Sequence, residues 1–452
     1  MAISRRKFFT LAGTTAAGVV VASPLEALFN RVALGKSVLG KGFGSLKPKF
    51  PENLQELPLE LQETPLLDLP KGFKYVAFSI TGQPMSDGNL VPEDHDGMAA
   101  FAGPRGSTIL VRNQEISASE ENQVIAPDSK KYDPLSAGGT STLIVSKERK
   151  LIRHFNSLAG TIRNCAGGPT PWGSWISCEE NTSTPAGNTP GDVNNVSKKH
   201  GFNFEVPARG GLVDPVPLIA MGRFNHEAVA VDPATSYVYE TEDRNDSCIY
   251  RFRPNRFGDL KSGGILEALV IKGMPTVDTS TGFLSKKGQS LPVEWVEIEE
   301  VNPDEDTLRF EAQEKGAAIF KRGEGAWYGN GNIYWVATTG GDLEAGQVWC
   351  YDTSANTVKL FIESTDRSVL DEPDNITIAP FGDFFLCEDG PETQFVVGIT
   401  PQGELYQFAR NALNTSEFAG ACFSPDGSTM FVNIQTPGIT LAIWPENGSW
   451  AR

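Results

Sequence analysis

The sequence contains no C-x-x-C pair, although it has six cysteines, at positions 165, 178, 248, 350, 387 and 422. Zinc ribbons and thioredoxin-like redox sites are therefore excluded. It also lacks a G-x-S-x-G elbow, an H-E-x-x-H signature and a Walker loop, which are motifs of serine hydrolases, zinc peptidases and P-loop NTPases. If the protein is a hydrolase, its attacking oxygen is most simply a metal-bound one.

Charged residues are scarce: they make up 21% of the chain, which has 46 glycines and 30 prolines. This composition favours a turn-rich β protein over a helical one. Basic residues are fewer than acidic ones, 39 against 56, so the formal net charge is −17. An acidic surface does not attract nucleic acid or anionic membranes. A phosphate substrate is still compatible, because bound multivalent cations reverse the local potential.

No apolar run near the N-terminus is long enough for a convincing membrane span. The stretch from Leu11 to Val21 is short and rich in Gly, Ala and Thr. It follows a twin-arginine pattern, SRRKFF at 4–9, and precedes a small-residue exit near Ala22. We predict a twin-arginine export signal over residues 1–22, with the export machinery as a partner, no stable membrane insertion and a periplasmic or secreted location. The alternative is an ordinary basic N-terminus before a first helix.

Six strand-like apolar runs follow Gly or Pro turns and end in polar or acidic residues. Such spaced copies of a turn and a short β run are typical of a propeller, whose inner strands line a central channel. We therefore predict an all-β fold, a six-bladed β-propeller, with the polar strand ends meeting at a metal cluster. The runs are PRGSTILVRNQE (104–115), PWGSWISCEEN (171–181), PATSYVYETEDR (233–244), GNGNIYWVATTGGD (329–342), PFGDFFLCEDG (380–390) and PDGSTMFVNIQ (425–435).

A second repeat of small or acidic residues precedes each run. We expect it where the chain enters the channel, so that the two repeats mark the two ends of each inner strand. The segments are EDHDGMAAF (93–101), RNCAGGPT (163–170), FNHEAVAV (224–231), KRGEGAWY (321–328), PDNITIA (373–379) and FAGACFS (418–424).

The domain organisation follows from these repeats. Residues 73–452 are predicted to form one propeller domain, because repeat architectures reach this size as a single unit. A strand from Phe73 to Ile80 is expected to complete the last blade and so hide an edge. Residues 23–72 have little strand signal and are predicted to be an arm on the surface. Two polar, Gly- and Pro-rich stretches, near 181–217 and 257–309, are predicted to be loops over one face.

The recurring acids are the candidate metal ligands. Converging carboxylates repel one another without cations, and many oxygen ligands suit calcium, whereas a thiolate suits iron or zinc. Cys178 directly precedes two acids, as does Cys387. The alternative is that these acids are ordinary residues of the turns that follow strands. The predicted metal ligands are Cys178, Glu179, Glu180, Glu227, Glu242, Asp243, Glu324, Asp374, Glu388 and Asp389.

Other residues of the repeats are candidates for the reaction itself. Arg322 lies two residues before Glu324, so the two side chains share a face in an extended segment. An arginine beside metal-binding acids is suited to gripping a phosphoryl group, and we predict Arg322 and Glu324 as catalytic residues. Arg163 and Arg244 are weaker candidates, and the alternative for each is a simple ion pair with a carboxylate. His95 and His226 lie beside acids and could be ligands or core residues.

The chain resembles the PhoX-type alkaline phosphatases over nearly its whole length. The most specific match is the tryptophan-cysteine-glutamate segment. The matching segments are GGPTPWGSWISCEE (167–180), NHEAVAVDP (225–233), ETEDR (240–244), KRGEGAWY (321–328), PDN (373–375), LCEDG (386–390) and FARN…EFAGACFSPDG…MFVNIQTPGIT (408–440).

This resemblance implies a propeller that is exported by the twin-arginine route and hydrolyses phosphomonoesters with an iron and calcium cluster. It implies that Cys178 binds iron, that acids matching Glu179, Glu227, Glu242 and Glu388 complete the metal shell, and that Arg322 holds the phosphate. Two departures from the family pattern, Gln114 and Pro169, cast doubt on catalytic efficiency and on the preferred ester.

Three functions remain open from the sequence. The first is a metallophosphatase that acts as a monomer on small phosphate esters. The second is a calcium-dependent lactonase or phosphodiesterase on the same scaffold, since fold alone does not fix the reaction. The third is a non-enzymatic propeller in which calcium is a structural plug.

Overall fold

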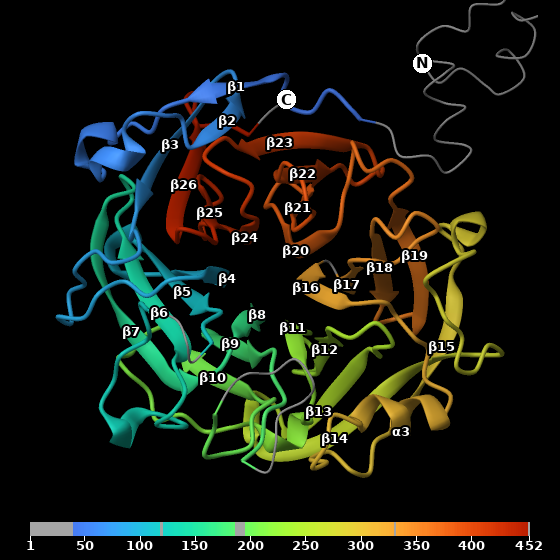
Figure 1. Cartoon of the computed structure of the whole chain (residues 1–452). Coiled ribbons are helices and arrows are strands. Elements are labelled where there is room, and N and C mark those ends of the chain that lie inside the picture. Colours follow the sequence, from blue (N-terminus) through green and yellow to red (C-terminus); the bar gives the residue numbers. More distant parts are fainter. Residues whose placement is uncertain (1–38, 118–120, 186–194, 330, 451–452) are drawn as a thin grey trace, which may run out of the picture.

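The computed structural model describes residues 39–117, 121–185, 195–329 and 331–450. Its strands are arranged as blades around a central axis, which confirms the predicted all-β propeller (Figure 1). One strand of each blade faces the axis, and each of these strands contacts the next around a closed ring. The inner strands are β4 (His95–Ala102), β8 (Asn164–Pro169), β11 (His226–Val231), β16 (Gly323–Gly329), β20 (Pro373–Ile378) and β24 (Phe418–Phe423).

The next strand in each blade pairs antiparallel with the inner one. These second strands are the apolar runs of the sequence, and most of their side chains are buried because they pack between blades. They are β5 (Thr108–Gln114), β9 (Ser174–Glu179), β12 (Val238–Glu242), β17 (Asn332–Ala337), β21 (Phe384–Glu388) and β25 (Met430–Ile434).

This pairing corrects the prediction that the two repeats mark opposite ends of one strand. The inner strand leads into a hairpin turn at its far end, and the second strand returns antiparallel beside it. The start of one therefore lies beside the end of the other, as in the pairs His95 with Gln114 and Asn164 with Glu179. Both repeats thus meet at the same mouth of the channel.

The outer strands complete the blades, but they do not form six separate sheets. β15 (Leu291–Glu297) pairs with both β14 and β19, so two blades merge into one nine-stranded sheet and the described residues form five sheets. The predicted loop at 257–309 thus contains all of β14 and all of β15. The outer strands are β6 (Gly138–Val145), β7 (Leu151–Thr161), β10 (Asn203–Pro207), β13 (Tyr250–Arg256), β14 (Asp259–Ile271), β18 (Gln347–Asp352), β19 (Thr357–Glu363), β22 (Phe395–Ile399), β23 (Leu405–Asn411) and β26 (Ile439–Pro445).

The segment that precedes the first inner strand contributes strands to the propeller. β3 (Phe73–Phe78) pairs with β26, the last strand, and so closes the final blade. β1 (Leu46–Lys49) and β2 (Leu67–Pro70) extend the blade that ends in β23. The prediction of a surface arm is therefore wrong for this part: leucines such as Leu66 and Leu69 are buried in the core, because they pack under the last two blades.

Helical structure is minor in the described residues. There is one α-helix, α3 (Leu308–Glu314), and no described helix is long and apolar enough to cross a membrane. The predicted export signal at residues 1–22 lies outside the described residues. The short 3-10 helices are η1 (Leu54–Glu56), η2 (Leu59–Leu61), η3 (Pro104–Gly106), η4 (Asp128–Lys130), η5 (Ile219–Met221) and η6 (Leu284–Lys286).

Small residues narrow the channel just inside the mouth. A methyl group on Gly97 would lie 2.6 Å from the Cα of Ala166, and one on Gly325 would lie 2.6 Å from the carbonyl oxygen of Asp374. The inner strands therefore approach backbone to backbone, which only glycine permits. The space left between them is about 20 Å³, roughly enough for one water molecule. The channel is therefore narrow below the mouth.

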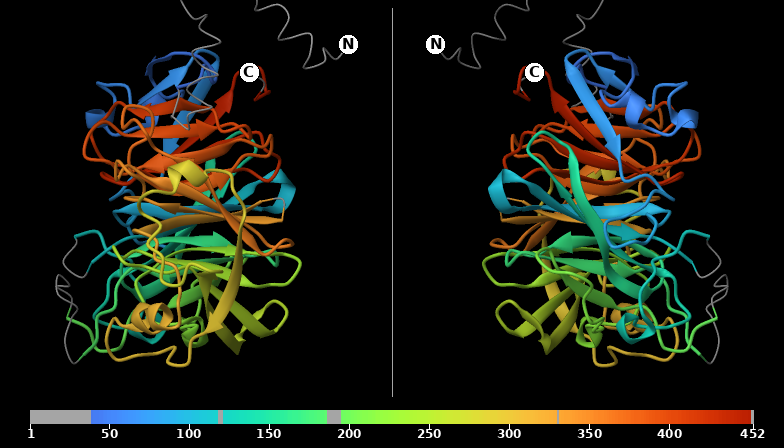
Figure 2. Two further views of the ribbon diagram at one scale, coloured as in Figure 1. Left: turned by 90° about the vertical axis from the view of Figure 1, so that its right-hand side faces the viewer. Right: turned by 90° about the vertical axis from the view of Figure 1, so that its left-hand side faces the viewer.

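Figure 2 shows the ring from the side, as a disc with longer loops on one face. These include the described parts of the loops that follow β5 and β9. The predicted loop at 181–217 contains β10 between residues 203 and 207, so it is only partly a loop. Residues 181–185 and 195–202 lie between the mouth ends of β9 and β10, whereas Ala208 donates to the Gly173 carbonyl in the hairpin turn at the far end of β9.

Candidate metal centre

The mouth of the channel is built from one backbone pattern, repeated in six blades. In each blade, the residue after the second strand donates its N–H to the carbonyl of the residue before the inner strand. The N···O distances run from 2.9 to 3.2 Å, and the pairs are Glu115–Asp94, Glu180–Arg163, Asp243–Asn225, Thr338–Arg322, Asp389–Glu372 and Gln435–Glu417. This repeat brings residues that are far apart in the sequence to equivalent places around one axis.

A β-bulge follows at the start of every inner strand. The register shifts between His95 and Met98 in β4, and an equivalent shift occurs in each of the other five hairpins. Bulges of this kind re-aim side chains next to functional sites. The second residue of each inner strand lies at this bulge, and these residues are Asp96, Cys165, Glu227, Glu324, Asp374 and Ala419.

Two groups of these side chains can each hold a metal ion. In the first, ligand atoms of Cys165, Glu180 and Glu227 all lie within 4.8 Å of one another. In the second, carboxylate oxygens of Glu227, Glu324 and Asp374 lie equally close. Glu227 belongs to both groups, so the two candidate sites are neighbours. The first group offers a thiol with two carboxylates, and the second offers oxygen alone.

Buried carboxyl groups dominate the electrostatics of the mouth. Burial raises the pKa of Glu227 well above its usual range, and the charges of Glu324 and Asp374 raise it further. For the same reason burial raises the pKa of Glu115 to about 8 and that of Asp389 to about 7. Glu417, just before β24, has its pKa raised by burial and by the nearby acids. Such crowding is costly for the protein alone and favours bound cations.

Two arginines stand among these acids. The Nη2 of Arg163 lies 2.5 Å from Glu115 and 2.6 Å from Glu180. Arg322 donates from Nε to Asp243 at 3.0 Å and from Nη2 to Glu324 at 2.7 Å. Both side chains are partly exposed, so both face the open side of the mouth.

The structure brings most of the predicted ligands together. Glu180, Glu227, Asp243, Glu324, Asp374 and Asp389 are at the mouth, as are the predicted catalytic residues Arg322 and Glu324. Burial raises the pKa of Asp243 to about 6, with Glu180 as the next cause. The Oδ1 of Asp374 is buried and has no hydrogen-bond partner among the described residues.

Three predicted acids turn away from the mouth, each being the first of an acidic pair. Glu179 accepts hydrogen bonds from His200 Nδ1 at 2.7 Å and from the Gly201 amide at 2.9 Å. Glu242 accepts from the Tyr250 hydroxyl at 2.8 Å. Glu388 accepts from the amides of Asp371 and Phe395, at 2.9 and 3.2 Å. The reason is the alternation of side chains along a strand, which sends neighbours to opposite sides.

Cys178 lies beside the mouth, where burial and the charges of Glu240 and Glu227 raise the pKa of its thiol. Its side chain is fully buried in an apolar cluster with Ile176, Phe224 and Val229. It belongs to neither of the candidate metal groups. Cys387 is buried in another apolar cluster. The thiol at the mouth is Cys165, which the sequence analysis did not single out.

The remaining candidates have structural partners. His226 is buried, with Nε2 3.1 Å from the Gly222 carbonyl, and His95 has Nε2 2.9 Å from the Pro92 carbonyl. Arg244 donates to Asp306 at 2.8 Å. Gln114 is the last residue of β5 and is buried beside Ser141.

Pro169 lies at the far end of the channel. It is the last residue of β8, whereas Cys165 lies near the start of that strand. With Val229, Trp327 and Tyr328 it lines a pocket of about 260 Å³. Pro169 therefore lies at the opposite end of β8 from Cys165, a member of the thiol-containing group.

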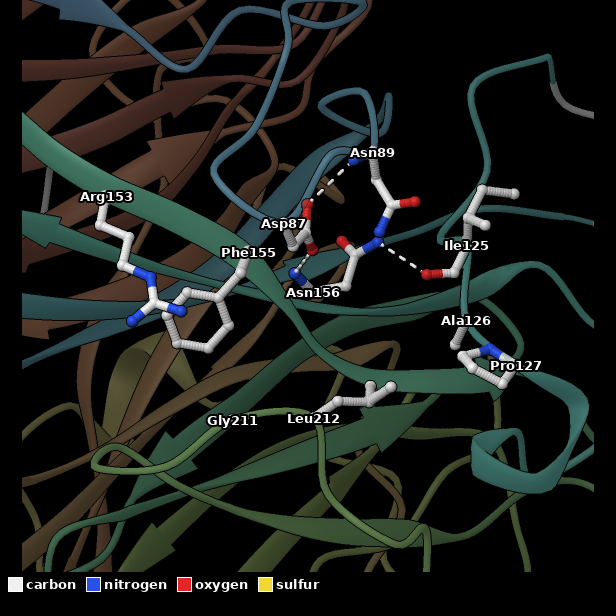
Figure 3. Close-up of a pocket in the computed structure, with 10 residues that line it drawn as sticks. All are labelled: Asp87, Asn89, Ile125, Ala126, Pro127, Arg153, Phe155, Asn156, Gly211 and Leu212. Atoms are coloured by element: carbon white, nitrogen blue, oxygen red, sulfur yellow. Dashed lines mark hydrogen bonds between the residues drawn. The ribbon is translucent and has the colours of Figure 1, made fainter.

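A further pocket lies on the outside of the ring. It has a volume of about 560 Å³ and is lined by residues of β7 and of the neighbouring loops (Figure 3). Its polar groups bond one another: Asp87 accepts from the amides of Asn89 and Asn156, and the Asn156 side chain donates to the Ile125 carbonyl. Arg153 stacks on Phe155. None of the acids of the mouth lines this pocket.

The fold and the mouth define a β-propeller with an acidic, thiol-containing candidate metal centre at one end of its channel. A family model described as "Alkaline phosphatase PhoX" matches residues 54–438, and the chain belongs to this family of phosphatase enzymes. No curated protein matches the sequence.

The chain is also similar to solved structures, of which the first reported supports the fold. PhoX of Pseudomonas fluorescens, in complex with vanadate described as a transition-state analogue, has a TM-score of 0.65 at 18% identity. The match covers 85% of this chain and 97% of that one. A gluconolactonase of Xanthomonas campestris has a TM-score of 0.44 at 10% identity, with 89% and 98% covered.

Proposed function

We propose that this protein is a phosphomonoester hydrolase whose catalytic centre is an iron and calcium cluster at the mouth of the propeller channel. The observation that carries the proposal is the pair of ligand groups that share Glu227, one with a thiol and one with oxygen alone. Membership of the PhoX family supports the phosphatase reaction, and a small phosphate ester is the expected substrate.

The residues present fit such a cluster. Iron accepts a thiolate together with carboxylates, which matches Cys165, Glu180 and Glu227. Calcium takes carboxylate oxygens, which matches Glu227, Glu324 and Asp374. The unpartnered Oδ1 of Asp374 and the raised pKa of buried Glu227 are what ligands show without their cation. Asp243, Asp389 and Glu417 are additional oxygen donors around these groups.

When bound, the metal ions would supply positive charge for the phosphoryl oxygens and activate the attacking water. The protein's own contribution is positioning. Glu324 and Asp243 hold the Arg322 guanidinium by three hydrogen bonds, so its direction is fixed before a substrate arrives. A guanidinium held in this way stabilises the charge that develops on a transferring phosphoryl group. The packed inner strands beneath the acids limit access to the exposed side.

A calcium-only lactonase or a structural calcium plug is less well supported. Neither has a use for a thiol among the metal ligands, and Cys165 lies within 4.8 Å of Glu180 and Glu227. We also propose export by the twin-arginine route to the periplasm or beyond, on the pattern in residues 4–22. Export of a folded protein would allow the metals to be inserted beforehand.

Elemental analysis of protein purified from an exporting host, combined with nitrophenyl phosphate hydrolysis, tests the proposal. We expect bound iron and calcium, and phosphate release that a calcium chelator abolishes. Arg322→Ala should keep its metals and lose most of its activity, on the order of 100-fold or more. Metal-loaded protein without any phosphate release would refute the assignment.

A further inference from the structure

Arg163 and Arg322 occupy equivalent places in two repeats. Each directly precedes an inner strand, β8 or β16, and each has a left-handed backbone, with φ of 44° and 53°. The carbonyl of each accepts an N–H from the residue after the second strand, at 2.9 Å in both blades. The fold therefore presents two guanidinium groups to one mouth from blades that flank β11.

Each arginine is tied to a different candidate metal group. Arg163 contacts Glu180, a member of the thiol-containing group, at 2.6 Å. Arg322 contacts Glu324, a member of the oxygen-only group, at 2.7 Å. Because Glu227 is shared by both groups, the two arginines lie on either side of the pair of sites. An anion bound across both sites would have a guanidinium on each side.

Arg163 has more unused donors than Arg322. Both of its ion pairs come from Nη2, and its Nε and Nη1 have no partner among the described residues. Those two nitrogens carry three of the five N–H groups of a guanidinium. Arg322, in contrast, uses Nε as well as Nη2. The Arg163 side chain is 37% exposed, against 13% for Glu180, so a ligand from solvent can reach it.

We infer that Arg163 is a second phosphate-binding residue, which holds the phosphoryl group of the substrate and the inorganic phosphate product opposite Arg322. The inference rests on the proposed phosphatase function. Arginine is suited to this role because its planar guanidinium donates several charge-assisted hydrogen bonds to phosphate oxygens. Its contacts with Glu115 and Glu180 orient it without using all of these donors. It acts in binding, and the attack on phosphorus does not require it.

The test compares Arg163→Met and Arg163→Lys with the wild type, all metal-loaded, using nitrophenyl phosphate and inorganic phosphate. Loss of one charged contact should raise KM and the inhibition constant of phosphate roughly tenfold in Arg163→Met, with a smaller change in kcat. Arg163→Lys keeps the charge but loses the planar set of donors of a guanidinium. We therefore expect an intermediate rise of a few-fold in both constants. This variant also replaces Arg163→Met in the test if the methionine variant does not fold. Arg153→Met, in the outer pocket of Figure 3, removes one charge elsewhere and should change neither constant.

Other outcomes separate the inference from the proposed function. Unchanged KM and phosphate inhibition, with altered metal content or a lower Tm, would mean that Arg163 only balances the charge of Glu115 and Glu180, and would overturn the inference. A wild type that hydrolyses no phosphate ester would instead remove the proposed function. In that case calorimetric titration with inorganic phosphate still decides, because equal affinity in wild type and Arg163→Met would exclude phosphate binding by Arg163.

Discussion

Glu179 and Glu180 are neighbours in the chain, yet their carboxylates point to opposite sides of β9. Glu179 accepts from His200 Nδ1 at 2.7 Å within the body of the protein, whereas Glu180 accepts from Arg163 at 2.6 Å at the mouth. The pairs Glu242–Asp243 and Glu388–Asp389 divide in the same way. In each pair the first acid fastens a segment of the chain and the second faces the channel.

This division predicts different consequences for the two members of a pair. Glu180→Gln should lower metal content and activity strongly, with a small effect on the free energy of unfolding. Glu179→Gln should destabilise by about 2–4 kcal/mol, because it removes the nearer of the two carboxylates that pair with buried His200. Urea unfolding and elemental analysis on the two variants measure both effects. Equal loss of metal in both would contradict the assignment of Glu179 as a structural residue.

The two cysteines of this blade provide a second matched pair. Cys165→Ala should remove the thiol from the candidate iron site, so bound iron and any thiolate-to-iron absorption should be lost. Cys178→Ala removes a sulfur from an apolar cluster and should cost about 1 kcal/mol of stability while metal content is kept. If iron is lost from the Cys178 variant alone, the placement of the thiol ligand is wrong.

His200 predicts how stability changes at alkaline pH. Burial lowers its pKa, but Glu179 and Asp133 outweigh burial and raise it to about 9. Its stabilisation is therefore complete below the unfolded value of 6.5 and is lost as the pH rises through about 9. The shift corresponds to roughly 3 kcal/mol. The difference in unfolding free energy between wild type and His200→Gln should shrink by about this amount from pH 6 to pH 10.

A second histidine is the control for this titration. Burial and the charge of Arg112 lower the pKa of His154 below its usual value. Its protonation changes below pH 6.5, so the stability difference for His154→Gln should stay constant between pH 7 and pH 10. A falling difference in both variants would point to general alkaline unfolding of the propeller instead of the His200 pair.

The fold was largely predictable from local patterns in the sequence. Turn residues before short apolar runs, repeated along the chain, were enough to predict blades and a strand from Phe73 in the last one. The merging of two blades through β15 was not predictable, because Leu291–Glu297 lies within a polar stretch and pairs over a long sequence distance. The burial of leucines in the predicted arm was not expected, because the prolines between them are typical of a surface segment.

The candidate site was predictable as a cluster but not residue by residue. Recurrence identified Glu227, Glu324 and Asp374, since each lies near the start of a repeat. Alternation along a strand leaves two choices for each acidic pair, and nothing local decides between Glu179 and Glu180. Cys165 was missed because it does not precede acids, which is the pattern that singled out Cys178 and Cys387. Aligning the segments that begin each inner strand would have found it, since Cys165 stands where four other blades carry Asp or Glu.

The close packing below the mouth leads to a last prediction, on Gly420. Its φ is 65°, and an added Cβ would lie 2.6 Å from the carbonyl oxygen of Asp96 and 2.9 Å from the Met98 amide nitrogen. Gly420→Ala should therefore cost several kcal/mol, from backbone strain of about 1–2 kcal/mol and from a clash that neighbouring backbone cannot relieve. It should also lower metal content, because Asp96 and Asp374 lie at the mouth beside it.

Gly448, with φ of 72° and nothing within 4 Å of an added Cβ, is the matched control: Gly448→Ala should show the strain alone in urea unfolding. Equal costs for the two alanine variants would mean that the inner strands have room to move apart, and that the channel is not narrowed by close backbone packing.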